Sequence, residues 1–442
     1  SPYKLTLNGL IAGGQLTFVC SYDSSCYRLE TIERFMADFF AHLQTIIAHC
    51  AAKERPELTP SDCSSKGIEL AEVEALNQAF DYPIEDIYRL TPMQEGMLFH
   101  ALTNHHSATY LEQFAFTVNG KLEVSRFQES LRQLSARYAI LRTAFVTSGV
   151  KQALQVVGKQ RDIEFTVVDG SAKSVWEYKE LDKQRGFDLR HDALMRVTIV
   201  QENDQRSHVL WSFHHILMDG WCLGIIIQEF FTIYRSLTSG TPLLLPPVQP
   251  FSNYIRWLEK QDAQQARAYW GNYISGYTQH AGLPKRSVPL KGDYDKQEHA
   301  FVLDTEMTEG LQQVARQHQV TLNTLIQTIW GLLLQKYNRS QDVVFGAVVS
   351  GRPAELPDVE RMVGLFINTI PVRVTSGGQQ RVSDLLRQVQ ETALSSERHS
   401  FYPLYEIQSQ SELGQGLVDH IVVFENYPVT SEAMNSGDAY EF

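Results

Sequence analysis

The sequence predicts an α/β fold in which two lobes of similar organisation follow one another. Strand-like and helix-like stretches alternate along the 442 residues, and 43% hydrophobic residues are enough to fill several cores. The order of elements in residues 111–213 returns in residues 299–350. Because strands, helices and strand pairs recur at that scale, we expect two α/β lobes, although no residue-by-residue repeat is visible.

Charge and hydropathy exclude several classes of protein. The chain has 39 basic and 51 acidic residues, a formal net charge of −12, and no long basic run, so nucleic acid and anionic membranes are poor primary partners. No apolar stretch reaches the roughly 18 to 20 residues that span a bilayer, and the N-terminus lacks a secretion signal. We therefore expect a cytosolic protein. Its five cysteines should be reduced, since they show neither disulfide-scaffold nor metal-site spacing.

The first residues predict a separate leading segment. Residues 15–22 alternate between apolar and polar side chains, as in a strand, and residues 32–47 carry apolar side chains at helical spacing. Residues 51–66 are rich in charge, proline and serine, which indicates a linker. The predicted divisions are a leading segment with its linker at 1–65, a linker helix at 66–83, a first lobe at 84–245 and a second lobe at 246–442.

The two lobes contain a regular series of predicted elements. In the first lobe we expect a helix starting at Thr91-Pro92, strands over 111–118, 141–145, 194–200 and 207–213, and helices over 125–138 and 223–234. In the second lobe we expect helical structure within 251–270, a strand over 299–304, helices over 307–318 and 322–337, a strand over 343–350 and a buried strand within 362–373.

The strongest chemical signal is a pair of histidines at the end of an apolar strand. The run Val209–Phe213 ends in His214 and His215, and Asp219 and Gly220 follow. A neutral imidazole at a rigid strand end can accept a proton near pH 7. Neighbours at a strand end point to opposite sides, so one ring should face a substrate while the other packs inward. We take His215 as the base and expect Gly220 to permit the turn.

Asp219 is better placed to pair with a cation than to titrate, because an unpaired buried carboxylate is strongly disfavoured. Arg352, which follows the apolar strand of the second lobe, is the candidate partner. Cys222 lies near the motif, so a catalytic thiol must be weighed, but a small apolar residue packed beneath the site is the preferred interpretation.

Asn368 lies inside the apolar run of residues 362–373, where its amide must find partners. It either pins the neighbouring backbone or faces a solvated channel. No metal site is expected, because His214 and His215 are adjacent rather than spaced for joint ligation and no third ligand is evident. The sequence also lacks a nucleophile elbow, a phosphate-binding P-loop and a dinucleotide-binding glycine motif.

Several motifs occur in one order along residues 84–442 and carry a family resemblance. They are His214–Gly220, Ser350–Arg352, Val363–Thr369 and Phe424–Pro428, with Leu90–Gln94, Leu141–Phe145, Phe251–Trp257 and His399–Tyr405. With these motifs the chain resembles condensation domains of nonribosomal peptide synthetases. The resemblance implies two chloramphenicol-acetyltransferase-like lobes in a V-shaped arrangement, with a central tunnel that admits phosphopantetheine arms from both faces.

The resemblance also implies a reaction. An acceptor amine would attack a donor peptidyl thioester, each substrate being carried by a peptidyl carrier domain, with adenylation and epimerization domains as neighbours and no cofactor bound directly. The implied site residues fall into three groups: the catalytic motif with His215, His214 and Gly220, the structural ion pair of Asp219 and Arg352, and Trp221, Asn368 and Ser350 as tunnel or substrate candidates.

The leading residues resemble the C-terminal end of an epimerization domain, on the stretches Pro2–Leu10 and Thr59–Asp62. An upstream epimerase implies a D-configured donor, and Met93–His100 with Met218–Cys222 resembles the subtype that joins a D-donor to an L-acceptor. The family fold normally continues beyond Phe424–Pro428 by several elements. Residues 1–50 are therefore also expected, as a hypothesis, to occupy that final position, within one chain or by exchange between chains.

Three alternative functions share the fold. An epimerization domain would need a carboxylate as a second acid/base partner, and Val363–Thr369 favours condensation over it. A non-catalytic docking module should have lost the catalytic histidine, whereas His215 is present. A coenzyme-A-dependent acyltransferase would leave the epimerase-like leading segment unexplained.

Overall fold

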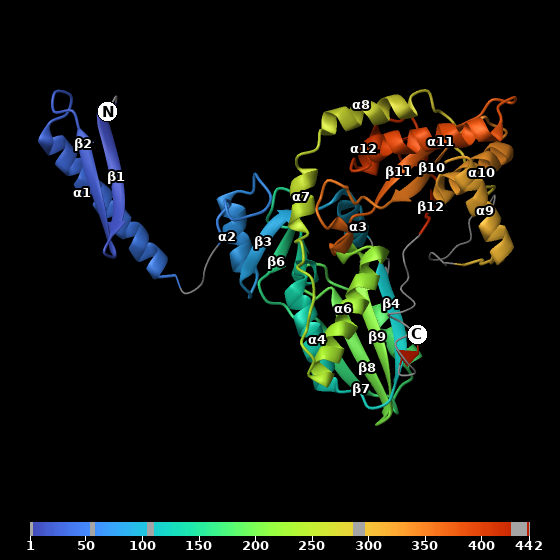
Figure 1. Ribbon diagram of the computed structural model, residues 1–442, viewed down its shortest axis with the longest axis horizontal. Helices are drawn as coiled ribbons and strands as arrows, with labels where there is room; N and C mark the ends of the chain where they lie inside the picture. Colours follow the sequence, from blue (N-terminus) through green and yellow to red (C-terminus); the bar gives the residue numbers. More distant parts are fainter. Residues whose placement is uncertain (1–2, 54–57, 104–109, 286–296, 426–439, 442) are drawn as a thin grey trace. The chain divides into compact units, whose positions relative to one another are not determined.

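The computed structural model describes residues 3–53, 58–103, 110–285, 297–425 and 440–441, and the chain divides into two compact units, Ser1–Glu57 and Leu58–Phe442 (Figure 1). The predicted Asn426–Pro428 part of one family motif lies outside the described residues. No disulfide joins the five cysteines.

The first unit is a hairpin followed by a long helix. Strands β1 (Leu5–Ala12) and β2 (Gln15–Tyr22) pair antiparallel, and Gly13 and Gly14 connect them with positive φ angles of 59° and 78°. Two left-handed residues suit the twist of a tight hairpin, which is why glycines stand there. Helix α1 (Leu29–Ala51) confirms the predicted helix, β2 confirms the predicted strand, and β1 was not predicted.

Taken by itself, this unit leaves many of its apolar side chains uncovered. Phe18 of β2 meets Phe39 of α1 edge to face at 5.1 Å, and Ile32 is buried. Large apolar side chains of the unit that stay exposed include Leu10, Ile11, Leu16, Val19, Leu29, Phe35, Phe40, Ile46 and Ile47. The unit's own residues therefore do not form a closed core around these side chains.

The first lobe of the second unit is built on two sheets. A five-stranded sheet has the order β13-β4-β9-β8-β7, and a three-stranded sheet has the order β3-β6-β5. The strands are β3 (Ile84–Arg89), β4 (Leu111–Asn119), β5 (Thr143–Val146), β6 (Leu154–Gly158), β7 (Glu164–Asp169), β8 (Met195–Asn203), β9 (Arg206–His214) and β13 (Tyr440–Glu441). The helices are α2 (Leu70–Ala79), α3 (Pro92–Thr103), α4 (Val124–Arg137), α5 (Val175–Arg185) and α6 (Gly220–Ser239), with 3-10 turns η1 (Ala139–Arg142) and η2 (His215–Leu217).

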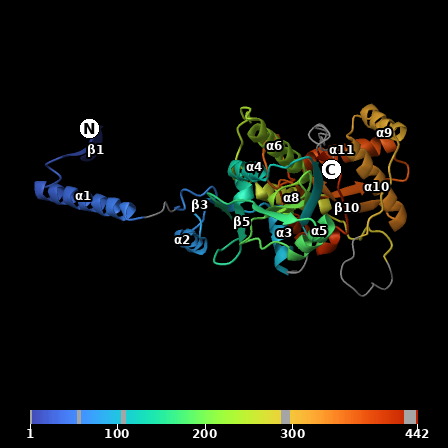
Figure 2. The same ribbon diagram turned by 90° about the horizontal axis from the view of Figure 1, so that it is seen from below.

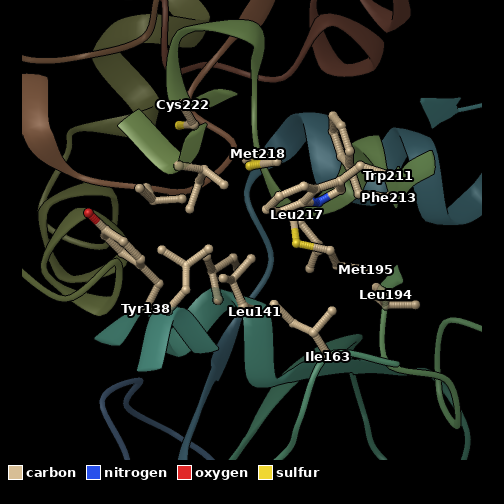
Figure 3. Close-up of a cluster of buried hydrophobic side chains, with 14 of the residues drawn as sticks. Tyr138, Leu141, Ile163, Leu194, Met195, Trp211, Phe213, Leu217, Met218 and Cys222 are labelled. Carbon is tan, nitrogen blue, oxygen red and sulfur yellow. The ribbon is translucent and has the colours of Figure 1, made fainter. Parts of the chain in front are cut away.

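The strands predicted over residues 194–200 and 207–213 are confirmed as β8 and β9. Strands β8 and β9 pair antiparallel with Met195 opposite Phe213, and β9 also pairs with β4, so β9 lies inside the sheet. Helices α4 and α6 pack against each other. Val209, Trp211 and Phe213 of β9 join one buried cluster with the apolar side chains of the turn after it, and Figure 3 shows Trp211, Phe213 and Leu217 of this cluster.

The segment predicted as a linker helix is part of the first lobe's core. Helix α2 buries Val73 and Leu76, which are 0% and 2% exposed, in a cluster with apolar residues of β3, β5 and β6. The interpretation as a connector was wrong, because these two side chains, three residues apart, form an apolar face that the sheet covers.

The second lobe has a three-stranded sheet of order β11-β10-β12. Its strands are β10 (Asp342–Val349), β11 (Asn368–Thr375) and β12 (Ile421–Val422). Its helices are α7 (Ser252–Leu258), α8 (Ala263–Ile274), α9 (Thr305–Gln317), α10 (Leu322–Asn338), α11 (Val382–Glu397) and α12 (Leu404–Ser409), with 3-10 turns η3 (Val359–Arg361) and η4 (Gly414–Leu417).

The strand predicted over residues 299–304 is absent; those residues have no regular structure. Phe301 and Val302 are 78% and 94% exposed, so the apolar side chains that suggested a strand have no covering layer in the described part of the second lobe. The predicted helices over 307–318 and 322–337 are confirmed as α9 and α10, which begin at Thr305 and Leu322.

The helices and strands of the second unit form two groups, one for each lobe, and the largest buried cluster contains residues of both groups. Figure 1 shows β7–β9, α4 and α6 in one group and β10–β12 with α8–α12 in the other, and Figure 2 shows the same separation of α4 and α6 from α9–α11. The largest buried cluster contains first-lobe residues together with Met362, Val363, Leu365 and Phe366 of the second lobe. The terminal strand β13 also returns to the first lobe, where it pairs with β4.

Candidate functional site

The two histidines of the motif occupy different environments. His214 is the last residue of β9 and is 5% exposed; its Nδ1 accepts a hydrogen bond from the Ile216 N–H at 3.1 Å. His215 opens η2 and is partly exposed. The backbone N–H of His215 donates to the Tyr110 carbonyl oxygen at 2.7 Å. The ring atom Nδ1 of His215 is buried without a hydrogen-bond partner among the described residues. One ring thus packs inward and the other does not, as predicted from the alternation of a strand.

His214 is held neutral. Burial, with a smaller contribution from the neighbouring His215, lowers its pKa to about 3. Because Nδ1 accepts the Ile216 N–H, the proton of the neutral ring belongs on Nε2. His214 is therefore a structural acceptor that fixes the turn carrying His215, and it cannot act as a base near neutral pH.

Asp219 and Arg352 form a buried ion pair between the lobes. Arg352 Nη2 lies 3.2 Å from Asp219 Oδ1, and the two side chains are 7% and 2% exposed. Asp219 Oδ2 accepts the Phe366 N–H at 3.1 Å. Arg352 Nη1 donates to the carbonyls of Val359 at 2.6 Å and Met362 at 3.0 Å. Both charges thus have hydrogen-bond partners, the condition under which a buried pair is tolerated.

Cys222 belongs to the same buried cluster and is not a nucleophile. Its thiol contacts Asp219 Oδ1 and the Gly364 carbonyl, both at 3.3 Å, and it receives a hydrogen bond from Arg352 Nη2 at 3.1 Å. Burial, with the Asp219 charge, raises the pKa of Cys222 to about 12. A thiol that stays protonated is a poor nucleophile.

Gly220 and Trp221 begin helix α6. Gly220 is not among the residues with left-handed φ, so the expectation that it permits a special turn was wrong: the position is the first of a helix. Trp221 Nε1 donates to the Glu360 carbonyl at 2.8 Å, which adds another contact between the lobes.

The predicted residues of the second lobe lie at the end of β10 and at the start of β11. Ser350 is exposed directly after β10. Gly351 has a φ of +60°, and a Cβ there would lie 1.9 Å from the Phe366 carbonyl oxygen, so only glycine fits. Asn368 is 6% exposed, and its amide nitrogen donates to the carbonyls of Ser400 at 2.7 Å and Tyr402 at 2.9 Å. Of the two roles weighed for Asn368, the structure shows the one that pins neighbouring backbone.

Gln94 supports the site, although the sequence indicated for it only a place in two family motifs and in the helix that starts at Thr91-Pro92. It is fully buried, and its amide nitrogen donates to the carbonyl of Ile216, the residue after His215, at 3.1 Å. Its Oε1 accepts the Thr91 N–H at 2.9 Å, which fixes the start of α3. A glutamine in the first turn of an apolar helix was the available signal, because a buried amide needs partners.

A separate cavity of about 470 Å³ lies where α3 meets α7, α8 and the start of α12. Tyr405 Oη donates to Glu95 Oε2 at 3.2 Å across it, and burial raises the pKa of Glu95. His215 does not line this cavity.

Two further features concern ligands and membranes. Within the described ranges, histidine, cysteine and acidic side chains form no group of three or more that could hold a metal ion. None of the described helices combines the length and apolar character needed to cross a membrane.

Comparison with known proteins identifies the family. A family model described as "Condensation domain" matches residues 1–68 and 84–442. A mycosubtilin synthase of Bacillus subtilis is 45% identical over 441 residues, which are 97% of this chain and 17% of that protein. Bacitracin synthase 3 of Bacillus licheniformis is 39% identical over 434 residues, 96% of this chain and 7% of that protein. The chain thus spans less than a fifth of either relative.

Solved structures share the fold. The starter condensation domain of rhizomide synthetase superposes with a TM-score of 0.62 at 20% identity, covering 77% of this chain and 80% of that domain. The X-domain from teicoplanin biosynthesis gives a TM-score of 0.62 at 21% identity, with 73% of each chain covered. These likenesses confirm the predicted mixed α/β fold. With the family model matched over most of the sequence, the chain belongs to the condensation domain family, the amide-bond-forming acyltransferases of nonribosomal peptide synthetases.

Proposed function

We propose that this chain joins a carrier-bound peptidyl donor to a carrier-bound aminoacyl acceptor, with His215 as the residue on which the reaction depends. The observation that carries the proposal is the placement of His215. It follows a buried strand and stays partly exposed, while its neighbour His214 is buried and neutral. Its buried Nδ1 leaves Nε2 as the nitrogen available to a substrate amine.

The proposed reaction needs little covalent chemistry from the protein. The lone pair of the acceptor amine forms the new C–N bond with the carbonyl carbon of the donor thioester. The C–S bond then breaks, and the donor sulfur leaves as a thiol with the proton that the amine loses. His215 orients the amine and takes up its proton, so alignment of the two reactants supplies much of the acceleration.

The other predicted residues have supporting roles in this proposal. Asp219 and Arg352 hold the turn after His215 against the second lobe. Trp221 and the exposed Ser350 are proposed to line the approach to His215. Phosphopantetheine arms of the upstream and downstream carrier domains would bring the substrates, and the chain itself would bind no further cofactor.

We also propose that the donor ends in a D-residue and that residues 1–65 are the end of an upstream epimerization domain. The family model matches residues 1–68 separately from 84–442, and the leading hairpin and helix form their own compact unit. The similarity to the mycosubtilin synthase runs through 97% of the chain, so the leading segment has a counterpart in that protein. Adenylation and carrier domains would then be neighbours in the same assembly.

The test is a condensation assay with donor carriers that bear D- or L-terminated aminoacyl groups, paired with an L-aminoacyl acceptor carrier, over a panel of side chains. We expect the wild-type chain to form dipeptide with D-donors at least tenfold faster than with L-donors. The His215→Ala variant should be at least 100-fold slower than the wild type with either donor. Equal D and L rates would remove the stereochemical proposal alone.

The same assay distinguishes the rival activity of this fold. An epimerization domain would exchange the Cα proton of a carrier-bound donor with solvent. In deuterium oxide, we expect mass spectrometry of the recovered donor to show no deuterium gained above that of the His215→Ala control. Deuterium gain without dipeptide would overturn the condensation proposal.

A further inference from the structure

Tyr110 adopts a backbone conformation that bulky residues rarely take. Its φ is +68°, in the left-handed region, and the residue is neither glycine nor asparagine. Such a conformation persists only where the surrounding structure over-determines it, and these residues concentrate at functional sites. Tyr110 stands directly before β4, which pairs with the strand that ends at His214.

The conformation places the Tyr110 carbonyl on the catalytic turn. Leu111 is opposite His214 in the β4–β9 ladder, and the next contact beyond the ladder is the hydrogen bond from the His215 N–H to the Tyr110 carbonyl at 2.7 Å. His215 is the first residue of a 3-10 turn, where the N–H has no partner within the turn itself. The Tyr110 carbonyl supplies that partner.

The side chain of Tyr110 is also placed at the histidines. Its ring centroid lies 6.2 Å from that of His214 and 6.4 Å from that of His100 on α3, and the ring is partly buried. Burial raises the pKa of the Tyr110 phenol, so its hydroxyl group stays neutral at pH values near 7. The ring of Tyr110 thus lies beside His214 and His100.

We propose that Tyr110 is a positioning residue for His215 and acts through its left-handed backbone. The carbonyl holds the His215 N–H and thereby sets the direction in which the His215 ring leaves the strand end. This inference rests on the proposed role of His215 in peptide-bond formation, but its structural half can be measured without any reaction.

The test uses residues that differ in their tolerance of the left-handed conformation. Asparagine and glycine adopt it readily, whereas β-branched valine does not. Tyr110→Asn, Tyr110→Gly and Tyr110→Val all remove the ring, so differences among them report the backbone. Tyr110→Phe keeps the ring and removes only the hydroxyl. Alanine, of intermediate tolerance, replaces valine in the series if Tyr110→Val does not fold in a thermal melt.

Two measurements decide the proposal. In dipeptide formation, we expect Tyr110→Val to lower kcat at least tenfold with the KM for both carriers changed less than twofold. Tyr110→Asn and Tyr110→Gly should stay within threefold of wild type, and Tyr110→Phe within twofold. In hydrogen exchange followed by mass spectrometry, the peptide containing His215 should exchange at least tenfold faster in Tyr110→Val than in Tyr110→Asn.

Equal kcat and equal exchange in the valine and asparagine variants would overturn the proposal. If both variants are impaired, the ring rather than the backbone matters, and if both are normal, neither matters. If wild type forms no dipeptide but the exchange difference is present, the proposed function fails while the positioning contact stands.

Discussion

His214 and His215 are adjacent and chemically identical, yet their side chains lie in different environments. His214 is buried and kept neutral, and its Nδ1 accepts a backbone N–H. His215 begins the next turn and stays partly exposed. The alternation of a strand predicts that the two rings separate. It does not predict how strongly burial lowers the pKa of His214, because that depends on side chains brought from other elements.

Replacing His215 should remove activity without unfolding the protein. For His215→Ala we expect dipeptide formation to fall at least 100-fold, the lower end of what a positioned acid or base contributes. The thermal midpoint should change by less than about 2 °C, because the lost ring is partly exposed and its buried Nδ1 makes no hydrogen bond among the described residues. His208→Ala, on the same strand, is the matched control and should keep wild-type rates. Normal rates in His215→Ala would remove this residue from the mechanism.

His214 should make the folded state sensitive to mild acid. Its pKa is lowered from 6.5 to about 3 by burial, so below about pH 6.5 the unfolded chain binds a proton there that the folded chain does not. Stability must therefore fall as the pH falls, and linkage gives about 2 kcal/mol between pH 7 and pH 5.

Denaturant unfolding at these two pH values measures this loss. The His214→Gln variant lacks the titrating group, so its loss between pH 7 and pH 5 should be smaller than that of the wild type by about 2 kcal/mol. Carboxylates and other histidines contribute equally to both proteins and cancel. Identical pH dependence in the two proteins would show that His214 is accessible to protons in the folded state.

At the scale of elements, the turn after β9 is secured by segments distant in sequence. Asp219 and Arg352 pair across the lobes, the Phe366 N–H donates to Asp219, and Gln94 of α3 holds the Ile216 carbonyl. The sequence indicated that Asp219 needs a cation and that Arg352 is available. It gave no reason to expect that Gln94 reaches the same turn, because helix periodicity says which residues share a face but not which element that face meets.

Breaking the ion pair should destabilise the protein strongly. Asp219→Ala leaves the Arg352 guanidinium buried without its counter-charge, and removal of one partner of a buried pair costs about 3 to 5 kcal/mol. Chemical denaturation measures this loss. Glu129→Ala breaks the exposed pair with Arg132 and should cost less than about 1 kcal/mol. A loss for Asp219→Ala as small as that of the control would mean that the pair is solvated.

The close approach at Gly351 can be tested separately. In Gly351→Ala, the new Cβ would collide with the Phe366 carbonyl oxygen, and the φ of +60° disfavours any side chain. We expect a loss of more than about 2 kcal/mol in unfolding free energy. Gly377→Ala is the control, because no atom lies within 4 Å of the position that its new methyl group would take, and it should change stability by less than about 0.5 kcal/mol.

At the scale of the whole molecule, the two lobes of the second unit depend on one another. Their largest core cluster includes Phe366, whose ring is 1% exposed and contacts Phe251 and Tyr254. Phe345 is also fully buried, but in a cluster made of second-lobe residues. The two phenylalanines therefore distinguish a shared core from a local one.

Removing these two rings should have different consequences. Phe366→Ala and Phe345→Ala should each cost about 3 to 5 kcal/mol. Native-state hydrogen exchange should show faster opening in both lobes for Phe366→Ala, and mainly in the second lobe for Phe345→Ala. Exchange confined to the second lobe in both variants would mean that the lobes are independent folding units.

The sequence by itself determined the class of the fold, most of its helices and strands, and the histidine motif, because these follow from local periodicity and from residue types at short spacing. It missed β1, placed a strand at 299–304 where none forms, and read α2 as a connector, since each of these depends on what covers an apolar face. The tertiary structure alone decided that His214 is neutral, that Asn368 pins backbone, and that Tyr110 and Gln94 reach the turn that begins at His215. Those outcomes depend on burial and on contacts between residues far apart in the chain, which local patterns do not encode.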